Sequence, residues 1–539
     1  MNRKKFRAAA CCMALAAVMA LTAGCGGNGM DSTQKVPEKS KEQLDKERKK
    51  LDLDFSVDLS KYAKQAVPAK TSVHDPSVIR GEDGTYYIFG SHMESAKSTD
   101  LRTWERLGNG YQPTNTVYGN LFDGHTDVFA YAGSNDSLIP TDGDGGVRLW
   151  APDVIYNEAM GKYCLYYCVT STFYTSNLCF GISDSIEGPY EWEAALIYSG
   201  FDMDTISGTD VLDYVDRDYA ETNYISGGEY NFRSWPNALD PSVFYDEDGR
   251  LWMVYGSWSG GIFLLELDEK TGKVIHPAAD PENNVDPYFG KRLLGGGHKS
   301  IEGPYILWDE ASGYYYLFVS YGSLTADGGY QIRVFRSETV DGTYVDMEGK
   351  YPDGGAGVHA FRGLKLSGNY NLPSVNLAYK ATGHNSAMVD EDGKRYIVYH
   401  TRFANSGEVH FPRVKQFFVN EEGWPCMLPY ATNGETIADE GYAKDAVVGR
   451  YYMVNQGTAI SAEVAQPIVL YLTDKGSVFG EDVEGTWAMT KGSPYMHIKI
   501  GEVEYSGVFC EMTDEAGTSV MTFTAVGENE SIWGVKYEE

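Results

Sequence analysis

The chain has 539 residues, of which 13% are aromatic, and a formal net charge of −31. A surface this acidic repels phosphate backbones and anionic lipid, so nucleic acid is excluded as an expected partner. The length is too great for one ordinary core unless that core is repeated, and 40 tyrosines, 22 phenylalanines and 60 glycines favour strands joined by tight turns.

The first 24 residues have the pattern of an export signal. Four basic residues within the first seven precede an apolar stretch that ends at Gly24 and is shorter than the roughly 20 residues needed to span a membrane. Ala23 and Gly24 before Cys25 resemble a bacterial lipobox, which implies cleavage before Cys25 and attachment of lipid to its thiol. We therefore expect residues 1–24 to be a lipoprotein signal peptide and the exported protein to be anchored at the bacterial cell surface or membrane through Cys25. An ordinary secreted protein is the alternative.

Residues 25–60 are polar and then highly charged, with almost nothing to bury, which predicts a disordered tether between the lipid and a globular part. Beyond the tether the chain has five cysteines, an odd number without zinc spacing. We expect them to be buried free thiols. They are Cys164, Cys168, Cys179, Cys426 and Cys510.

Five segments share one pattern: a short apolar run, a turn that contains glycine, and an aromatic run that ends near serine or threonine. Each predicts a β-hairpin, and several are followed by a second hairpin. The segments are "DPSVIRGEDGTYYIFGS" from Asp75, "APDVIYNEAMGKYCLYYCVTS" from Ala151, "DPSVFYDEDGRLWMVYGS" from Asp240, "EGPYILWDEASGYYYLFVSYG" from Glu302 and "HNSAMVDEDGKRYIVYHTR" from His384.

Two hairpins make a four-stranded sheet, and five such sheets around an axis make a five-bladed β-propeller. The sequence therefore predicts an all-β fold, with a catalytic propeller over residues 61–435. Residues 440–539 alternate apolar and polar side chains and predict a small antiparallel β-barrel. The stretches 108–149 and 196–236 are expected to be long insertions that shape the mouth of the propeller.

The innermost strands of a propeller all begin at the same end of the central channel. The residues at the start of each repeat should therefore converge, and these are Asp75, Asp153, Asp240, Glu302 and His384, counting Asp153 and Asn385 as anchors of the second and fifth repeats. Acids that share a partly desolvated site repel one another, so that one can stay protonated while another is ionised. Cleavage of a glycosidic bond needs such a pair.

The segments "HDPSVI", "WAPDVIYN", "LDPSVFYDEDGRLWMVYGSW", "SIEGPYILW" and "TGHNSAMV" occur in blade order and resemble glycoside hydrolase family 43. With "YYIFGSH", "YHTRF" and "NEEGWPCMLPY", they are most similar to the extracellular endo-arabinanases of that family that carry an additional C-terminal β domain. The resemblance implies an inverting hydrolase that cleaves α-1,5-linked L-arabinofuranose chains (arabinan). An arabinofuranosidase or β-xylosidase of the same family remains open. A glycan-binding surface lipoprotein without catalysis is disfavoured, because all three acids are present.

The resemblance assigns a role to each acid. It implies that Asp75 is the general base, Glu302 the general acid and Asp240 a third carboxylate that raises the pKa of the acid and orients it. An inverting enzyme should hold the carboxyl groups of base and acid roughly 6.5–9.5 Å apart. Each residue also has a plainer explanation: an aspartate before proline often begins a turn, and "EGPY" also occurs at Glu187 in an outer hairpin.

The resemblance also implies that His384 helps to hold a metal ion, usually calcium, in the channel. Because calcium prefers oxygen ligands, we expect water to fill most of its coordination shell. The protein is expected to be a monomer.

Several residues near these motifs are candidates for contact with the sugar. Aromatic faces can stack on a sugar ring, although packing between blades explains the same residues equally well; these are Trp150, Phe173, Tyr255 and Trp258. His74 and Arg402 lie beside motif residues and are candidates for hydrogen bonds to substrate hydroxyls, with His92 less specific. Asp153 is expected to serve the architecture of the blades.

Overall fold

The structure is a computed structural model that describes residues 36–64, 71–109, 115–118, 121, 126–132, 149–170, 174–351 and 359–537. The expected signal peptide and Cys25 lie outside the described residues. The described part belongs to one compact unit, Val36–Glu539. Within that part, no helix combines the length and the apolar character needed to cross a membrane.

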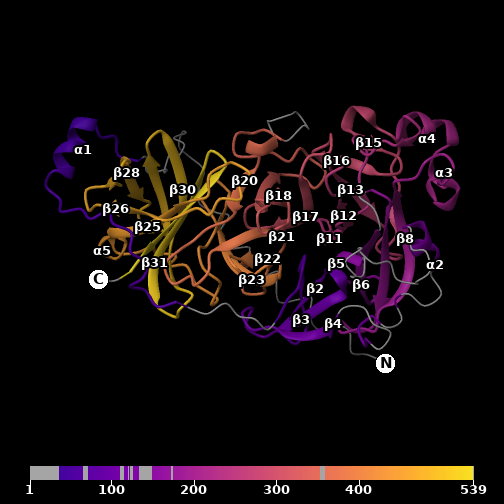
Figure 1. Cartoon of the computed structure of the whole chain (residues 1–539), viewed down its shortest axis with the longest axis horizontal. Helices are drawn as coiled ribbons and strands as arrows, with labels where there is room; N and C mark the ends of the chain where they lie inside the picture. Colours follow the sequence, from indigo (N-terminus) through magenta and orange to yellow (C-terminus); the bar gives the residue numbers. More distant parts are fainter. Residues whose placement is uncertain are drawn as a thin grey trace, which may run out of the picture. The chain divides into compact units, whose positions relative to one another are not determined.

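Five antiparallel sheets form the blades of a propeller (Figure 1). Blade 1 contains β1 Ser77–Arg80, β2 Tyr86–Gly90, β3 Glu94–Ser98 and β4 Glu105–Asn109. Blade 2 contains β5 Leu149–Asn157, β6 Lys162–Thr170, β7 Ser176–Ser183 and β8 Glu191–Ser199. Blade 3 contains β11 Ser242–Tyr245, β12 Leu251–Tyr255, β13 Ile262–Leu267 and β16 Gly290–Leu294, extended by β14 Val274–Ile275 and β15 Val285–Asp286. Blade 4 contains β17 Ile301–Asp309, β18 Tyr314–Tyr321, β19 Gln331–Ser337 and β20 Leu364–Ser367. Blade 5 contains β21 Tyr379–Val389, β22 Arg395–Phe403, β23 Phe411–Val419 and β24 Pro425–Met427.

The first hairpin of each blade turns where the sequence places glycine. In blade 1, Ser77 pairs with Phe89 and Arg80 with Tyr86, and Gly84 in the connecting turn has φ +84°. Only glycine adopts this backbone conformation without a steric cost. The Asp-Gly turns therefore fix the register of the hairpins, as the repeat predicts.

The hydrophobic cores lie between neighbouring blades, so each sheet buries both of its faces. Five clusters pair successive blades, and the last one pairs blade 5 with blade 1. The first strands β1, β5, β11, β17 and β21 also contact one another in ring order, including β1 with β21. The five-bladed propeller expected from the sequence is thus confirmed. Members of the five clusters, in blade order, are Phe89 with Leu165, Phe180 with Met253, Val254 with Leu317, Phe318 with Tyr399, and Val398 with Ile88.

The C-terminal part is a closed eight-stranded antiparallel barrel, which confirms the predicted β-barrel. It closes by pairing its first strand with its last and packs on the propeller through a core shared with blades 4 and 5. Its strands are β25 Gly449–Asn455, β26 Ile468–Leu472, β27 Ser477–Phe479, β28 Glu484–Met489, β29 Tyr495–Ile500, β30 Val503–Thr513, β31 Ser519–Gly527 and β32 Glu530–Lys536.

Helices are few and short. The stretch 196–236 forms α3 Val211–Tyr214, α4 Arg217–Tyr224 and a small hairpin of β9 Ile225–Ser226 and β10 Glu229–Tyr230. The other α-helices in the described part of the chain are α1 Lys41–Arg48, α2 Thr126–Tyr131 and α5 Lys444–Val447.

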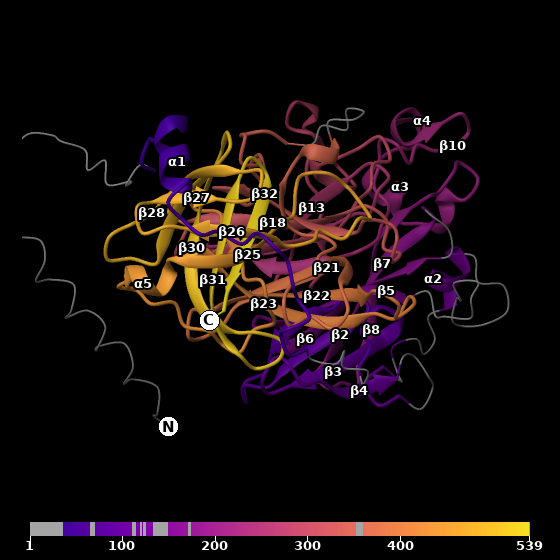
Figure 2. The same ribbon diagram turned by 60° about the vertical axis from the view of Figure 1, so that its left-hand side comes forward.

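The expectation of a disordered tether is wrong for residues 36–60. Helix α1 begins with a capping box at Ser40 and lies beside the barrel strands β27 and β28 (Figure 2). Phe55 meets the ring of Tyr471 edge-on with centroids 5.8 Å apart, and the guanidinium of Arg48 lies 5.1 Å from the Phe55 ring. The charged residues that suggested a tether instead bind the barrel; Lys39, for example, donates to the backbone oxygen of Lys475 at 2.8 Å.

The five cysteines of the globular part are unpaired and buried, as expected. Burial raises the pKa of the Cys179 thiol and of the Cys168 thiol, so both remain protonated at neutral pH. They act as small apolar residues of the cores between blades.

Candidate active site

One residue at the start of each blade has the same unusual backbone conformation. All five have positive φ, a conformation that is costly for residues other than glycine and is enriched at functional sites. They are Asp75 at +55°, Ala151 at +39°, Asp240 at +55°, Gly303 at +57° and His384 at +45°. In four of them proline follows directly, and asparagine follows the fifth.

Four of these positions line a small cavity on the axis of the propeller, and blade 4 contributes the two residues after Gly303, so every blade takes part in the lining. The predicted convergence of the strand starts is therefore found. The equivalent residues differ from the expected anchors, however: Ala151 rather than Asp153 matches Asp75 in blade 2, and His384 rather than Asn385 matches it in blade 5. In blade 4 the equivalent residue is Gly303, which leaves Glu302 one position earlier.

The carboxylate of Asp75 is surrounded by histidines. Its Oδ1 lies 3.0 Å from Nδ1 of His384, 3.1 Å from Nε2 of His74 and 3.4 Å from Nδ1 of His400. Ser91 donates its hydroxyl to Oδ2. Burial alone would raise the pKa of Asp75, but these histidines outweigh it and hold the pKa well below its usual range. Asp75 is therefore ionised at neutral pH, as a general base must be.

The surroundings of Glu302 favour its protonated form, in contrast to those of Asp75. Its Oε2 accepts hydrogen bonds from Oγ of Ser257 at 3.0 Å and from Nε1 of Trp258 at 2.9 Å. Burial nevertheless raises the pKa of Glu302, although a hydrogen bond from Tyr330 opposes the rise. A carboxyl group with a raised pKa can remain protonated and donate its proton, as a general acid must.

Asp240 is the third acid of the site. Its Oδ2 accepts a hydrogen bond from the backbone N–H of Gly303 at 3.1 Å, which ties it to the residue next to Glu302. Burial raises the pKa of Asp240 to about 7, with His384 opposing the rise and the charge of Glu302 adding to it. The charge of Glu302 thus favours the protonated form of Asp240.

Asp153 holds the blades together. Its Oδ1 accepts from the Ser77 hydroxyl and from the backbone N–H of Val154, and its Oδ2 accepts from the backbone N–H of Val243 at 2.6 Å. These partners come from blades 1, 2 and 3. Burial raises the pKa of Asp153 to about 6.

The predicted sugar contacts have different surroundings. Trp258 binds Glu302 directly and is partly exposed. Trp150 is also partly exposed and packs on the core between blades 2 and 3. Tyr255 is fully buried and donates its hydroxyl to Phe289 O at 2.9 Å, so it is a core residue. Phe173 lies outside the described residues.

The two polar residues expected to bind substrate hydroxyls differ in how far they are buried. His74 touches Asp75, as described above, with 15% of its side chain exposed. Arg402 is 2% exposed, and its guanidinium pairs with Glu408 at 2.5 Å and donates to Leu324 O. The guanidinium of Arg402 is thus already bound by other groups of the protein.

Sequence reasoning missed four residues of the site: Ser91, Ser257, Tyr330 and His400. Ser91 and His400 stand in the quoted segments "YYIFGSH" and "YHTRF", and Ser257 follows "WMVYG". Tyr330 lies outside every repeat segment, and no sequence signal marks it.

Among the histidines that the structure describes, His384 is the one whose charge interacts with all three acids. Asp75, Asp240 and Glu302 outweigh the effect of burial and raise the pKa of His384. One imidazole nitrogen beside several carboxylate oxygens suits a calcium ion whose remaining ligands are water.

A propeller that brings one ionised and one protonatable carboxyl group into electrostatic contact has the arrangement of a glycoside hydrolase. Comparison with known proteins agrees. A model of glycosyl hydrolases family 43 matches residues 216–425, and a model of a C-terminal lipocalin-like domain matches residues 429–534.

The chain is 38% identical over 498 residues to the extracellular endo-alpha-(1->5)-L-arabinanase 2 of Bacillus subtilis strain 168, with 89% of this chain and 96% of the relative covered. The extracellular endo-alpha-(1->5)-L-arabinanase of Thermotoga petrophila is 38% identical over 485 residues, with 87% and 94% covered. A crystal structure of endo-1,5-alpha-L-arabinanase from Thermotoga petrophila RKU-1 superposes with a TM-score of 0.75 at 37% identity, covering 89% of this chain and all of that one. The chain belongs to glycosyl hydrolase family 43.

Proposed function

We propose that the protein is an inverting glycoside hydrolase that cleaves α-1,5-linked L-arabinofuranose chains. The observation that carries the proposal is the opposite direction in which the pKa values of Asp75 and Glu302 are shifted, in two carboxyl groups that interact electrostatically with each other and with His384. Two relatives that align with most of this chain are named endo-arabinanases, which supports arabinan as the substrate.

In this mechanism Glu302 donates its proton to the leaving oxygen of the scissile bond, while Asp75 draws a proton from the attacking water on the other side of the sugar. Ser257 and Trp258 hold the carboxyl group of Glu302 in place. The histidines around Asp75 keep it ionised until the water proton arrives. Asp240 raises the proton affinity of Glu302 through its nearby charge.

Calcium is part of the proposal. His384 would hold the ion together with water, and the ion would supply positive charge that orients the substrate and balances the acids. Removal of calcium by a chelator is expected to lower activity, and its return to restore it. Unchanged activity in metal-free protein would remove calcium from the proposal.

The experiment that tests the function compares linear arabinan with xylan as substrates. We expect arabino-oligosaccharides to appear before free arabinose, and proton NMR of the first products to show inversion at the anomeric carbon. Single sugars from the outset would indicate an exo-acting arabinofuranosidase, xylose alone would refute the substrate, and binding without products would indicate a glycan-binding protein.

Export of the enzyme fits the two relatives named extracellular. We further propose that the signal peptide is removed before Cys25 and that the thiol of Cys25 carries diacylglycerol. Mass spectrometry of the mature N-terminus should then find a lipid-modified cysteine, and Cys25→Ser should release the enzyme into the medium. Retention of the Cys25→Ser protein on the membrane would contradict this.

A further inference from the structure

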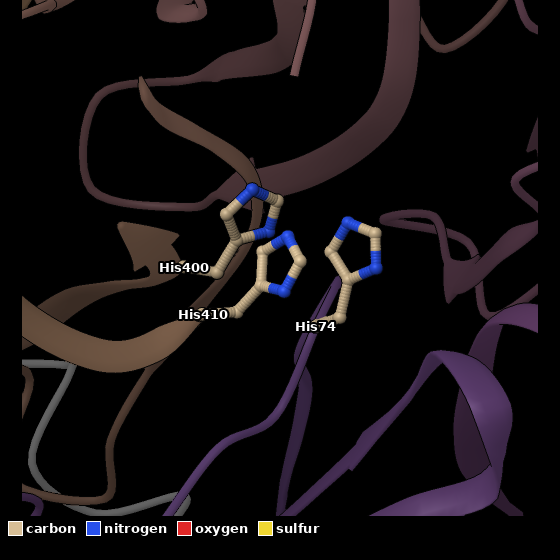
Figure 3. A group of neighbouring side chains, drawn as sticks. All are labelled: His74, His400 and His410. Atoms are coloured by element: carbon tan, nitrogen blue, oxygen red, sulfur yellow. The ribbon is translucent and has the colours of Figure 1, made fainter. Parts of the chain in front are cut away.

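Three histidines meet at the junction of blades 1 and 5 (Figure 3). His74 lies just before β1, His400 lies in β22, and His410 immediately precedes β23. One ring nitrogen of each lies within 4.8 Å of a ring nitrogen of both others. The rings of His74 and His410 stack with centroids 3.7 Å apart, and the His400 ring lies 4.8 Å from His74 and 4.9 Å from His410.

These rings have nitrogen atoms without hydrogen-bond partners. Among the described residues, Nδ1 of His74 and Nε2 of both His400 and His410 are buried and form no hydrogen bond. His400 is completely buried. Because buried polar atoms are nearly always hydrogen-bonded, three unpartnered nitrogens in one cluster mark a place for a ligand. With the ring protons on the other nitrogens, the three free lone pairs fit a metal ion.

A divalent transition-metal ion has the matching chemistry. Imidazole nitrogens suit zinc, nickel and copper, whereas calcium and magnesium prefer oxygen ligands. Asp75 lies beside two of these rings: its Oδ1 is 3.1 Å from Nε2 of His74 and 3.4 Å from Nδ1 of His400, and its backbone N–H approaches the same Nδ1 of His400 at 3.2 Å. Binding of the ion through Nε2 of His400 requires the ring proton on Nδ1, facing Oδ1 of Asp75. A carboxylate beside a metal-binding histidine orients the ring and makes it a better ligand.

The site needs only a small adjustment to close around an ion. Nitrogens bound to zinc at about 2.0–2.1 Å in a tetrahedron are about 3.3 Å apart, compared with at most 4.8 Å here. His400 is fixed in a central strand of its sheet, but His410 ends a turn whose residues 405 and 407–409 are exposed. Rotation of the His410 side chain can therefore bring the third nitrogen inward.

We propose that His74, His400 and His410 bind one divalent transition-metal ion such as Zn²⁺, which joins blade 1 to blade 5. Its ligands differ from the one proposed for calcium, His384, although Oδ1 of Asp75 contacts histidines of both sites. The proposal does not depend on the substrate assigned to the enzyme. An ion that binds only the folded ring also stabilises it.

The test titrates the full-length protein, saturated with calcium and freed of transition metals, with ZnCl₂ in a calorimeter. We expect one zinc ion per chain, a rise in Tm, and competition by NiCl₂ but not by MgCl₂. His410→Asn should weaken zinc binding at least tenfold and abolish the rise in Tm. His276→Asn, a change to a histidine of blade 3 outside the cluster, should behave like the wild type.

Equal zinc affinity of His410→Asn and the wild type, or the absence of zinc binding by the wild type, would overturn the proposal. Because a variant can fail to fold, crystals of the wild type soaked in zinc give an independent answer. Anomalous scattering should place one ion about 2.0–2.1 Å from a nitrogen of each of the three rings. An ion bound at His384 instead, or none at the cluster, would also refute the site.

Discussion

Two glutamates of this chain begin the same tetrapeptide, "EGPY", yet only one can act as an acid. Glu187 has 43% of its side chain exposed and pairs with Lys97 at 3.0 Å. Glu302 is held by Ser257 and Trp258, and its charge interacts with Asp75 and His384. The difference comes from position in the blade: Glu187 follows an outer strand, whereas Glu302 opens an innermost one.

Glu302→Gln should lower kcat by at least 10²–10⁴-fold, because the amide cannot donate the proton that the leaving group needs. Affinity for arabino-oligosaccharides should change little, since the shape of the side chain is kept. Glu187→Gln is the matched control and should retain full activity. Steady-state kinetics and calorimetric binding measure both effects, and normal turnover of Glu302→Gln would disprove its role.

Ser257→Ala should move the alkaline limb of the kcat/KM profile to higher pH. The hydroxyl of Ser257 stabilises the ionised form of Glu302 and so lowers its pKa. Without this hydrogen bond the pKa of Glu302 rises, and the acid stays protonated at higher pH. Ser323→Ala, at an exposed position, should leave the profile in place; a shift toward lower pH in Ser257→Ala would contradict the assignment.

At the scale of strands and turns, the repeated hairpins could be predicted because each carries its own turn chemistry. The five segments contain their turn glycines and aromatic runs within about 20 residues, and all five became the first two strands of a blade. The equivalent position in blade 2 was misplaced by two residues. The sequence offered Asp153 as a match for Asp75, but the backbone there turns at Ala151.

Other parts of the site depend on contacts between distant segments. Tyr330 approaches Glu302 only because β18 and β19 pair in blade 4. The packing of residues 36–64 on the barrel likewise needs the barrel surface, which no local pattern reveals. Local propensity is a weak guide where tertiary contacts decide.

Asp153→Ala should destabilise the protein by about 2–4 kcal/mol, because it leaves buried N–H and O–H donors of three blades without an acceptor. Urea unfolding measures the change. KM of the remaining folded enzyme should stay close to that of the wild type, since Asp153 serves the blades. Asp184→Ala, which removes an exposed acid of the same blade, is the control; a large rise in KM with unchanged stability would instead indicate contact with substrate.

At the scale of the whole molecule, the barrel and propeller share a core that contains a buried lysine. Lys415 in β23 is 1% exposed, and its Nζ forms no hydrogen bond among the described residues. The amine lies 4.1 Å from the centre of the Trp533 ring and 4.4 Å from that of Tyr370. Burial lowers the pKa of Lys415 well below its ordinary value.

Lys415→Met should therefore stabilise the protein at pH 7 by about 1–3 kcal/mol, because an apolar side chain of similar length avoids the cost of burying the amine. The folded chain binds fewer protons than the unfolded chain between the lowered pKa of Lys415 and its ordinary value near 10.4. In that window Lys415 makes the wild type more stable as pH rises, so the advantage of the variant should shrink from pH 7 to pH 9.

Urea unfolding at several pH values measures this difference. Lys270→Met, at an exposed turn, controls for the loss of one positive charge. A Lys415→Met protein that is less stable than the wild type at pH 7 would mean that the contacts of the ammonium with Trp533 and Tyr370 outweigh its burial.

The ring closes without exchanging a strand between its ends: blade 1 is built entirely from β1–β4 and blade 5 from β21–β24. The bond from the Ser386 hydroxyl to Pro76 O therefore joins groups 310 residues apart. At a synthesis rate of about 5–20 residues per second, roughly 15–60 s separate the appearance of these two partners. During that interval one apolar face of the nascent first sheet is not covered by blade 5. The fraction of chains that escapes aggregation therefore depends on the time needed for synthesis and export as well as on the stability of the folded protein.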